Sequence, residues 1–144
     1  MSHSKVKIWI HGILGVKNRD NSIIPDIEKQ IHELIKKQFI DTGCYVKEIN
    51  GTANHIHVIF LLNPQKTISE IFKQIKGAVS YEINSRNLIK NKFLWQVGYG
   101  AFSVSKSKVN EIKNYIKKQK QHHKKMTFKE EYDKFMTLYN LKAH

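Results

Sequence analysis

Two hydrophobic spacings alternate along the chain, one typical of β-strands and the other of α-helices. Stretches rich in apolar and β-branched residues predict three strands, at residues 5–14, 45–50 and 55–62. Residues 51–54 predict a hairpin turn between the second and the third strand. A shorter stretch with a similar pattern predicts a fourth strand at residues 101–105.

Apolar residues at helical spacing predict four helices between and after these strands. The first begins at Pro25 and is stopped by Gly43. The second begins after Thr67, which has a glutamate three residues on, as in a capping box. A third helix is expected after Ser107, and a fourth after a second capping box at Thr127.

The order strand–helix–strand–strand–helix–strand predicts the α+β class with a ferredoxin-like, split-βαβ arrangement. In that arrangement one antiparallel sheet carries helices on one face. We expect residues 1–144 to form a single domain, with a ferredoxin-like core at 1–105 and a helical region at 106–144. The same fold serves RNA-binding modules, metal-binding domains and nucleases, so it does not select a function.

Composition adds a strong positive charge to this picture. The 144 residues include 25 Lys and Arg against 12 Asp and Glu, a net charge of +13 at pH 7, and the lysines are densest at residues 106–125. A small domain with this charge is typical of proteins that bind nucleic acid. An anionic membrane surface is the second candidate partner, and a merely solvated lysine-rich surface is the third interpretation.

The same composition excludes several classes of protein. A hydrophobic content of 40% is enough for a packed core, and no apolar run approaches the roughly 20 residues of a membrane span. The N-terminus lacks the apolar stretch of a signal peptide, so we expect a cytoplasmic protein, nucleoid-associated when bound to DNA. Cys44 is the one cysteine, which excludes a disulfide scaffold and a four-cysteine zinc module.

His55 and His57 are the first candidates for chemistry. They lie two residues apart in a predicted strand, so their imidazoles project from one face and can coordinate one divalent ion. Such a pair arises readily by chance among eight histidines, and two solvent-facing strand histidines are the alternative. The pair therefore needs a third ligand before it indicates a metal site.

Tyr115 and Gln119 lie one turn apart on the third predicted helix and share a face. A phenol can act as a nucleophile toward phosphorus when a metal or lysines help it to ionise, and an amide oxygen can join two histidines around a hard ion. A tyrosine that merely edges the core is the alternative. His122 and His123 form a rival ligand pair, but adjacent helical residues point about 100° apart.

Other enzyme designs fit the sequence poorly. The four aspartates fall in predicted loops, at helix ends or on surfaces, so no close acidic pair is placed to hold two metals. The sequence has no P-loop, no dinucleotide-binding glycine pattern and no Gly-x-Ser-x-Gly elbow. We therefore expect no nucleotide cofactor.

Four stretches, taken in order, resemble those of HUH single-tyrosine transposases of the smallest bacterial insertion sequences. The first carries the His–hydrophobe–His signature within residues 51–59, and the second is the aromatic and glycine-rich run at 95–105. The third is Tyr-Ile-Lys-Lys-Gln at 115–119, and the last runs from 121 to 132. The likeness covers nearly the whole chain, and the ordered set is far more specific than the histidine pair alone.

The resemblance implies a metal-dependent transposase of single-stranded DNA with its nucleophile on a C-terminal helix. Tyr115 would attack a phosphodiester and form a 5′-phosphotyrosine intermediate, with Mg²⁺ or Mn²⁺ held by His55, His57 and Gln119. One phosphodiester replaces another, so the reaction needs no ATP. The implied partners are DNA with subterminal hairpins and a second copy of the chain. In such homodimers the tyrosine helix often completes the partner's site in trans, through a joint expected here at 103–107.

Two departures from the family pattern stand out. Relatives encoded beside repetitive extragenic palindromes have an Asn-Pro pair soon after the tyrosine, whereas this chain has Lys-Gln-Lys-Gln at 118–121, which favours the insertion-sequence group. The first predicted strand is interrupted by His11, whose role the sequence leaves open, with a polar strand residue as the default.

Candidate DNA contacts are basic residues in loops and beside the tyrosine, and a solvated charge is the alternative for each. They are Lys17, Arg19, Arg86, Lys90, Lys92 and Lys118. Trp95, Tyr99 and Phe102 are candidates for base stacking, with packing as the alternative. Two other functions stay open: a non-catalytic, domesticated module that binds single-stranded or hairpin nucleic acid on the same fold, and a relaxase-type nickase, for which 144 residues leave little room.

Overall fold

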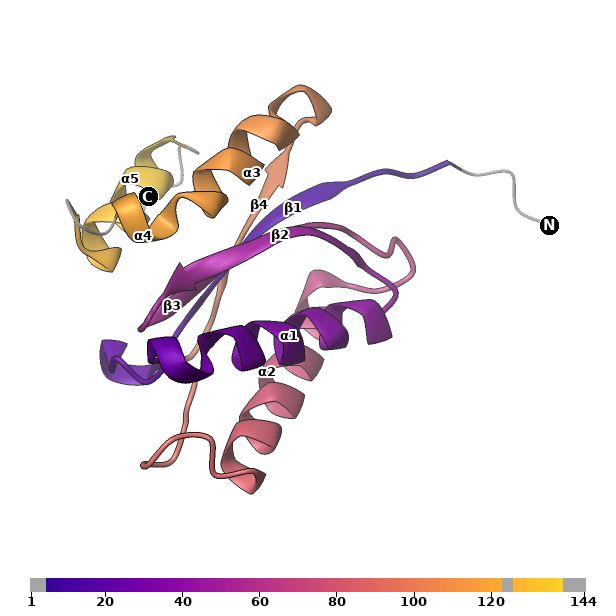
Figure 1. Ribbon diagram of the computed structural model, residues 1–144. Coiled ribbons are helices and arrows are strands. Elements are labelled where there is room, and N and C mark those ends of the chain that lie inside the picture. Colours follow the sequence, from indigo (N-terminus) through magenta and orange to yellow (C-terminus); the bar gives the residue numbers. More distant parts are fainter. Residues whose placement is uncertain (1–4, 123–125, 139–144) are drawn as a thin grey trace.

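The computed structural model describes residues 5–122 and 126–138, and it centres on one four-stranded antiparallel sheet (Figure 1). The strands lie in the order β2-β3-β1-β4. Their bounds are Trp9–Gly15 for β1, Tyr45–Thr52 for β2, His55–Leu61 for β3 and Gly100–Val104 for β4. This strand order confirms the ferredoxin-like α+β arrangement.

Helices cover both faces of the sheet. The first two, α1 (Pro25–Asp41) and α2 (Ile68–Ser85), pack on one face, as predicted. The helical C-terminal region lies on the opposite face in Figure 1. It comprises α3 (Val109–Lys117), the single-turn α4 (Gln119–His122) and α5 (Phe128–Leu138). Short 3₁₀ helices, η1 (Lys17–Arg19) and η2 (Lys106–Lys108), follow β1 and β4.

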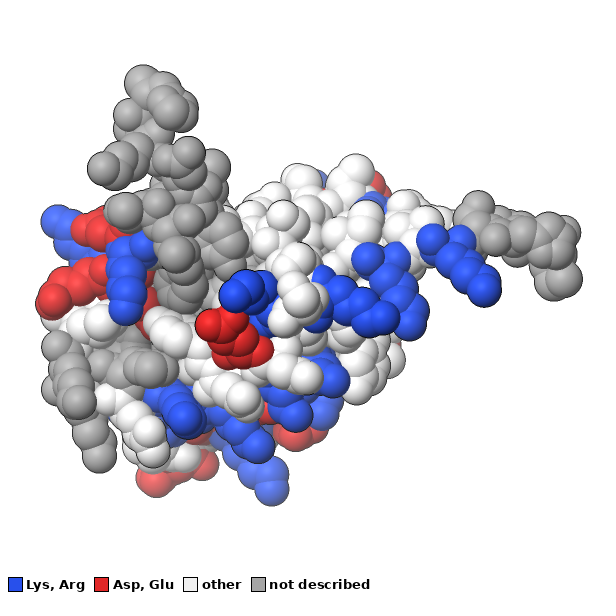
Figure 2. Space-filling view, turned by 90° about the horizontal axis from the view of Figure 1, so that it is seen from above, with Lys and Arg blue, Asp and Glu red and all other residues white. Residues whose placement is uncertain are grey.

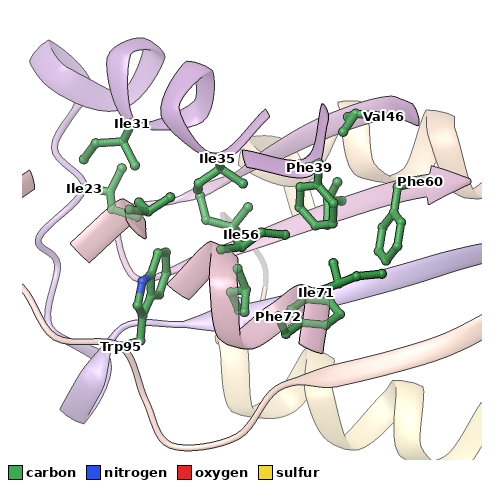
Figure 3. Close-up of a cluster of buried hydrophobic side chains, with 14 of the residues drawn as sticks. Ile23, Ile31, Ile35, Phe39, Val46, Ile56, Phe60, Ile71, Phe72 and Trp95 are labelled. Carbon is green, nitrogen blue, oxygen red and sulfur yellow. The ribbon is translucent and has the colours of Figure 1, made fainter. Parts of the chain in front are cut away.

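The main core fills the space between the sheet and the first pair of helices (Figure 3). Successive side chains of a strand point to opposite faces, and Ile56, Val58 and Phe60 of β3 all point into this core. Phe39 and Phe72 bring aromatic rings to it from α1 and α2. The intervening residues of β3 therefore face the C-terminal helices, and two of them are the histidines.

Several local predictions are confirmed and others are corrected. The capping box at Thr67 is formed in full, and at Thr127 the side chain accepts from the backbone N–H of Glu130 while the glutamate accepts in return. Ser107 is not a helix cap, because it lies inside η2, where its hydroxyl contacts that of Ser105. The expected joint at 103–107 therefore consists of the end of β4 and a 3₁₀ turn.

Three boundaries also differ from the predicted ones. The first strand begins at Trp9, four residues later than expected, and β2 extends to Thr52 inside the predicted turn. The helix that carries Tyr115 ends at Lys117, so Gln119 opens the next turn instead of continuing the same helix.

Among the described residues, no helix is both long enough and apolar enough to cross a membrane.

Candidate functional site

His55 and His57 lie on the face of β3 that is covered by the C-terminal helices. Both side chains are fully buried, so the alternative of two solvent-facing strand histidines is wrong. Their Nε2 atoms converge on Glu131 Oε1, at 3.3 Å from His55 and 2.8 Å from His57. The two imidazoles thus point at one common position, as the spacing predicted.

The Nδ1 atoms of both rings contact neighbours on the sheet or in the turn between β2 and β3. His57 Nδ1 lies 2.8 Å from Nε2 of His11, which is paired with Ile59 across β1 and β3. His55 Nδ1 lies 2.8 Å from Asn54 Oδ1 and 2.9 Å from the hydroxyl of Thr52. Such contacts fix the orientation of a ligating imidazole and leave Nε2 for the ion.

His11 therefore has a role that the sequence left open. It is completely buried, and this burial lowers the pKa of His11 well below its usual range, with His57 adding to the effect and Glu131 opposing it. The ring is neutral at neutral pH and supports His57 from the strand alongside. It is a positioning residue in this arrangement.

Glu131 is the residue that sequence reasoning missed. It follows the capping box on α5, its side chain is buried, and its two oxygens have different neighbours. Oε1 faces the histidines, whereas Oε2 accepts hydrogen bonds from Gln119 Nε2, at 2.9 Å, and from the Tyr115 hydroxyl. The overlooked signal is its position three residues after Phe128 in the inward stripe of α5, where a charged side chain has to be compensated.

Gln119 also reaches the centre, although a break in the helix separates it from Tyr115. The chain leaves helical geometry at Lys118, and Gln119 is nevertheless fully buried. Its Oε1 lies 3.2 Å from His55 Nε2 while its amide nitrogen donates to Glu131. The amide oxygen is therefore on the side of the histidines, where the resemblance placed it.

Tyr115 edges the core and also faces His57 of the histidine pair. Its half-buried ring packs against the cluster of Ile59 and Ile116 and stands edge-on to His57, with ring centroids 6.1 Å apart. Its hydroxyl donates to Glu131. Burial raises the pKa of Tyr115 far above its usual value; the hydrogen bond to Glu131 and the charge of that carboxylate raise it further, and Gln119 opposes the rise. The phenol is protonated at neutral pH.

The donor set fits a divalent cation. One ligand atom each from His55, His57 and Glu131 lies within 4.8 Å of the others. His55 Nε2 lies 3.3 Å from Glu131 Oε1 and 3.2 Å from Gln119 Oε1, so one nitrogen and two oxygen donors face the same position. Imidazole nitrogens with carboxylate and amide oxygens suit Mn²⁺ and tolerate Mg²⁺.

The segment that carries Gln119 is fastened to the rest of the fold by polar contacts. Asn50 of β2 donates to the Lys117 carbonyl at 3.0 Å and accepts from the Lys120 ammonium at 2.8 Å. Lys120 also forms an ion pair with Glu28 of α1, at 2.8 Å. These contacts fasten the end of α3 and the start of α4 to β2 and α1 of the chain that also carries the two histidines.

The six basic residues expected to contact DNA are all exposed, and two of them adjoin residues of the site. Arg19 is connected to it through Phe128, whose ring lies 5.9 Å from the guanidinium and stacks on His55. Lys118 precedes Gln119 directly, while Arg86 is paired with Glu82 at the end of α2. Figure 2, seen from the α3 side, shows basic side chains spread over this face with acidic ones among them.

The remaining candidates divide by burial. Trp95 and Phe102 belong to hydrophobic clusters, which supports packing, while Tyr99 is 39% exposed. The rival pair His122 and His123 lies outside the residues whose side chains are described.

A ferredoxin-like sheet with two histidines on one strand and a tyrosine beside them defines the class of HUH-type tyrosine enzymes. The chain belongs to the IS200-like transposase family, whose profile matches residues 4–119. It is therefore a transposase of the IS200-like type.

Individual relatives agree with this assignment. The chain is 25% identical over 115 residues to the ISDra2 transposase TnpA of Deinococcus radiodurans, covering 76% of this chain and 81% of that protein. A crystal structure from Deinococcus radiodurans, assigned as a transposase, shares the fold with a TM-score of 0.67 at 19% identity, covering 83% of this chain and 95% of the other. A REP-associated tyrosine transposase bound to a REP hairpin gives a TM-score of 0.63 at 16% identity, covering 85% and 74% of the two chains.

Proposed function

We propose that this transposase cleaves and rejoins single-stranded DNA through a covalent bond between Tyr115 and a 5′-phosphate, with a divalent cation held by His55, His57 and Glu131. The observation that carries the proposal is the position of the Tyr115 hydroxyl, which donates to the same buried carboxylate that the two imidazoles face. Nucleophile and cation donors therefore share one centre in one chain. Gln119, whose amide oxygen faces His55, is the fourth candidate ligand.

The chemistry of these residues balances without a cofactor that is consumed. The phenol oxygen of Tyr115 forms a bond to phosphorus while the bond from phosphorus to the 3′-oxygen of the preceding nucleotide breaks. The phenol proton passes to Glu131 Oε2, which already accepts its hydrogen bond. Glu131 then releases this proton to water, and the departing 3′-oxygen takes one proton from water and becomes a hydroxyl. A DNA 3′-hydroxyl can reverse the step, because one phosphodiester has replaced another.

Tyr115 needs an electrostatic change before it can react. The pKa of its phenol is raised by burial and by the nearby carboxylate, so the residue is held in its protonated form. A divalent cation, when bound at the donor set, supplies positive charge that favours the phenolate and polarises the scissile phosphate. We expect Mg²⁺ or Mn²⁺, because hard oxygen donors complete the set.

Single-stranded DNA with a hairpin is the partner that the other observations support. The net charge of +13 favours a polyanion, and one relative of the same fold is bound to a REP hairpin. The family resemblance adds a homodimer to this proposal. Tyr115 lies beside the histidines of its own chain, so a complete site within each protomer is the arrangement that the geometry supports.

The test is formation of a covalent adduct. The protein is incubated with single strands of the DNA that flanks its coding sequence, with Mg²⁺ or Mn²⁺, and the products are separated on a denaturing gel. We expect an adduct for the wild type that Tyr115→Phe abolishes and that Tyr81→Phe, which changes an exposed tyrosine on α2, retains. An adduct that persists in Tyr115→Phe would overturn the nucleophile, and hairpin binding with no adduct in either metal would favour the non-catalytic module.

The ligands are tested in the same assay. His57→Gln and Glu131→Gln should each lower the rate of adduct formation by at least about 100-fold at subsaturating Mn²⁺, while hairpin binding changes little because lysines dominate the affinity. Equal rates for Glu131→Gln and the wild type at every Mn²⁺ concentration would remove Glu131 from the site.

A further inference from the structure

A cavity of about 390 Å³ opens beside the candidate site. Its aromatic wall consists of Tyr99, from the segment before β4, and of Phe128 and Tyr132 on α5. Arg19 of η1 adds a guanidinium, and Gln96 adds an amide. The volume is in the range of roughly 300–1,000 Å³ that is usual for small-ligand sites.

Only one aromatic ring separates this cavity from the candidate metal ligands. The ring of Phe128 stacks on His55 with centroids 4.1 Å apart and an angle of 1° between the planes, and it also lines the cavity. Gly15 permits this arrangement, because a Cβ at that position would lie 3.1 Å from the Phe128 ring. A group seated in the cavity against Phe128 would therefore be separated from His55 by the thickness of that ring.

The wall has the chemistry of a base-binding site. Unpaired bases stack on aromatic side chains and on guanidinium planes, and amide groups hydrogen-bond to their edges. Here the Arg19 guanidinium lies 5.9 Å from the centre of the Phe128 ring. Tyr99 is 39% exposed and Val97 is 91% exposed, so the cavity can be entered from solvent at residues 97–99.

Two sets of contacts hold the wall in place before any ligand arrives. The Lys76 ammonium donates to the carbonyls of Gln96 and Gly98, at 2.8 and 2.9 Å, and fastens that segment to α2. The Arg19 N–H donates to the Val16 carbonyl at 2.9 Å, and the Tyr99 ring stacks on the buried ring of Phe72 with centroids 4.3 Å apart. A wall that is already ordered loses little conformational entropy on binding.

We infer that this cavity binds one unpaired nucleobase of the DNA strand, next to the phosphate that Tyr115 attacks. The inference rests on the proposed function for the identity of the strand. The net charge of +13 favours a nucleic acid over a neutral small molecule, and a base still paired in a duplex is not free to enter. The base stacks on Phe128 or Tyr99 and pairs its edge with Arg19 or Gln96.

The test uses a decathymidylate with one central 2-aminopurine, whose fluorescence is quenched when the base stacks on an aromatic ring. We expect quenching on binding to the wild type and a loss of affinity of roughly 5- to 150-fold in Tyr99→Leu and Arg19→Gln, the range for one stacked base. Tyr81→Leu is the matched control, because Tyr81 is an exposed tyrosine on α2 outside the cavity. Circular dichroism confirms that each variant is folded.

A change in the DNA tests the same point without altering the protein. Replacing every nucleotide of the strand by a tetrahydrofuran abasic analogue should weaken binding to the wild type more than binding to Tyr99→Leu, because only the wild type has the Tyr99 ring for a base to stack on. Equal affinity of the wild type for both oligonucleotides, or equal losses in Tyr99→Leu and Tyr81→Leu, would overturn the inference. These outcomes are separate from the adduct assay: an adduct without base-dependent binding refutes the cavity alone, and base-dependent binding without an adduct refutes the nucleophile alone.

Discussion

Replacing Ile116 by alanine should release the tyrosine helix while leaving the main core intact. Ile116 is fully buried on α3, and with Val109 it docks the helix onto Ile59 and Val104 of the sheet. This cluster is separate from the one that α1 and α2 form on the opposite face. Truncation of a buried isoleucine costs about 2–5 kcal/mol, because apolar contacts are lost and a cavity remains.

The size of the effect follows from where that free energy is lost. If α3 opens locally, its amide hydrogens should exchange roughly 30- to 4,000-fold faster, at about 1.4 kcal/mol per factor of ten. The amides of α1 and α2 should keep their protection, because their core is unchanged. Adduct formation should slow as well, since the Tyr115 hydroxyl is positioned by the same helix.

Hydrogen exchange followed by mass spectrometry measures both regions at once. Ile35→Ala on α1 is the matched control, because Ile35 is equally buried but belongs to the main core, and it should accelerate exchange throughout the sheet. Exchange in Ile116→Ala that rises equally in α1, α2 and α3 would refute the reasoning, since the two faces would then unfold as one unit.

Three further predictions concern stability and metal affinity. Burial lowers the pKa of His11, so near the ordinary value of about 6.5 only the unfolded chain takes up a proton at this residue. The free energy of unfolding of the wild type should therefore fall as the pH drops below that value. Urea titrations of His11→Gln should show a shallower fall with pH. Equal pH slopes would contradict this. Thr127→Ala removes the N-terminal cap of α5, the helix that carries Glu131, so it should lower the free energy of unfolding by about 0.5–2 kcal/mol. The same variant should bind Mn²⁺ more weakly when binding is measured by calorimetry. Unchanged affinity would show that the cap does not position the carboxylate. Gly12→Ala places a Cβ 2.7 Å from the buried ring of Phe72 and should lower stability by about 1–3 kcal/mol, which a thermal melt at or above the wild-type midpoint would contradict.

The fold was predictable because local signals and the overall pattern agree. Thr67 caps α2 as expected, and the alternation in β3 separates the core residues from the histidines. Ser107 was misassigned because a serine before an apolar helix favours a cap, whereas here a 3₁₀ turn intervenes and α3 begins without a side-chain cap. Such turns have no distinctive hydrophobic period.

The site was only partly predictable, for a related reason. Spacing within one strand places His55 beside His57. The short separation in sequence keeps Tyr115 near Gln119 although the helix breaks at Lys118 between them. Hydrophobic periodicity, however, does not indicate which distant helix packs over a strand. Glu131 comes from α5 and meets His57 across 74 positions of sequence, so its role depends on tertiary packing. The capping-box pattern indicates a role for its neighbour, Glu130, which is exposed and caps the helix.

The most direct test of the account is anomalous diffraction from crystals of the protein grown with Mn²⁺ and recorded at the manganese absorption edge. The account predicts one strong peak among Nε2 of His55, Nε2 of His57 and Oε1 of Glu131, with the Tyr115 hydroxyl alongside. A strong peak elsewhere, or manganese held by the histidines with Tyr115 turned away from it in both its own and a neighbouring chain, would contradict it.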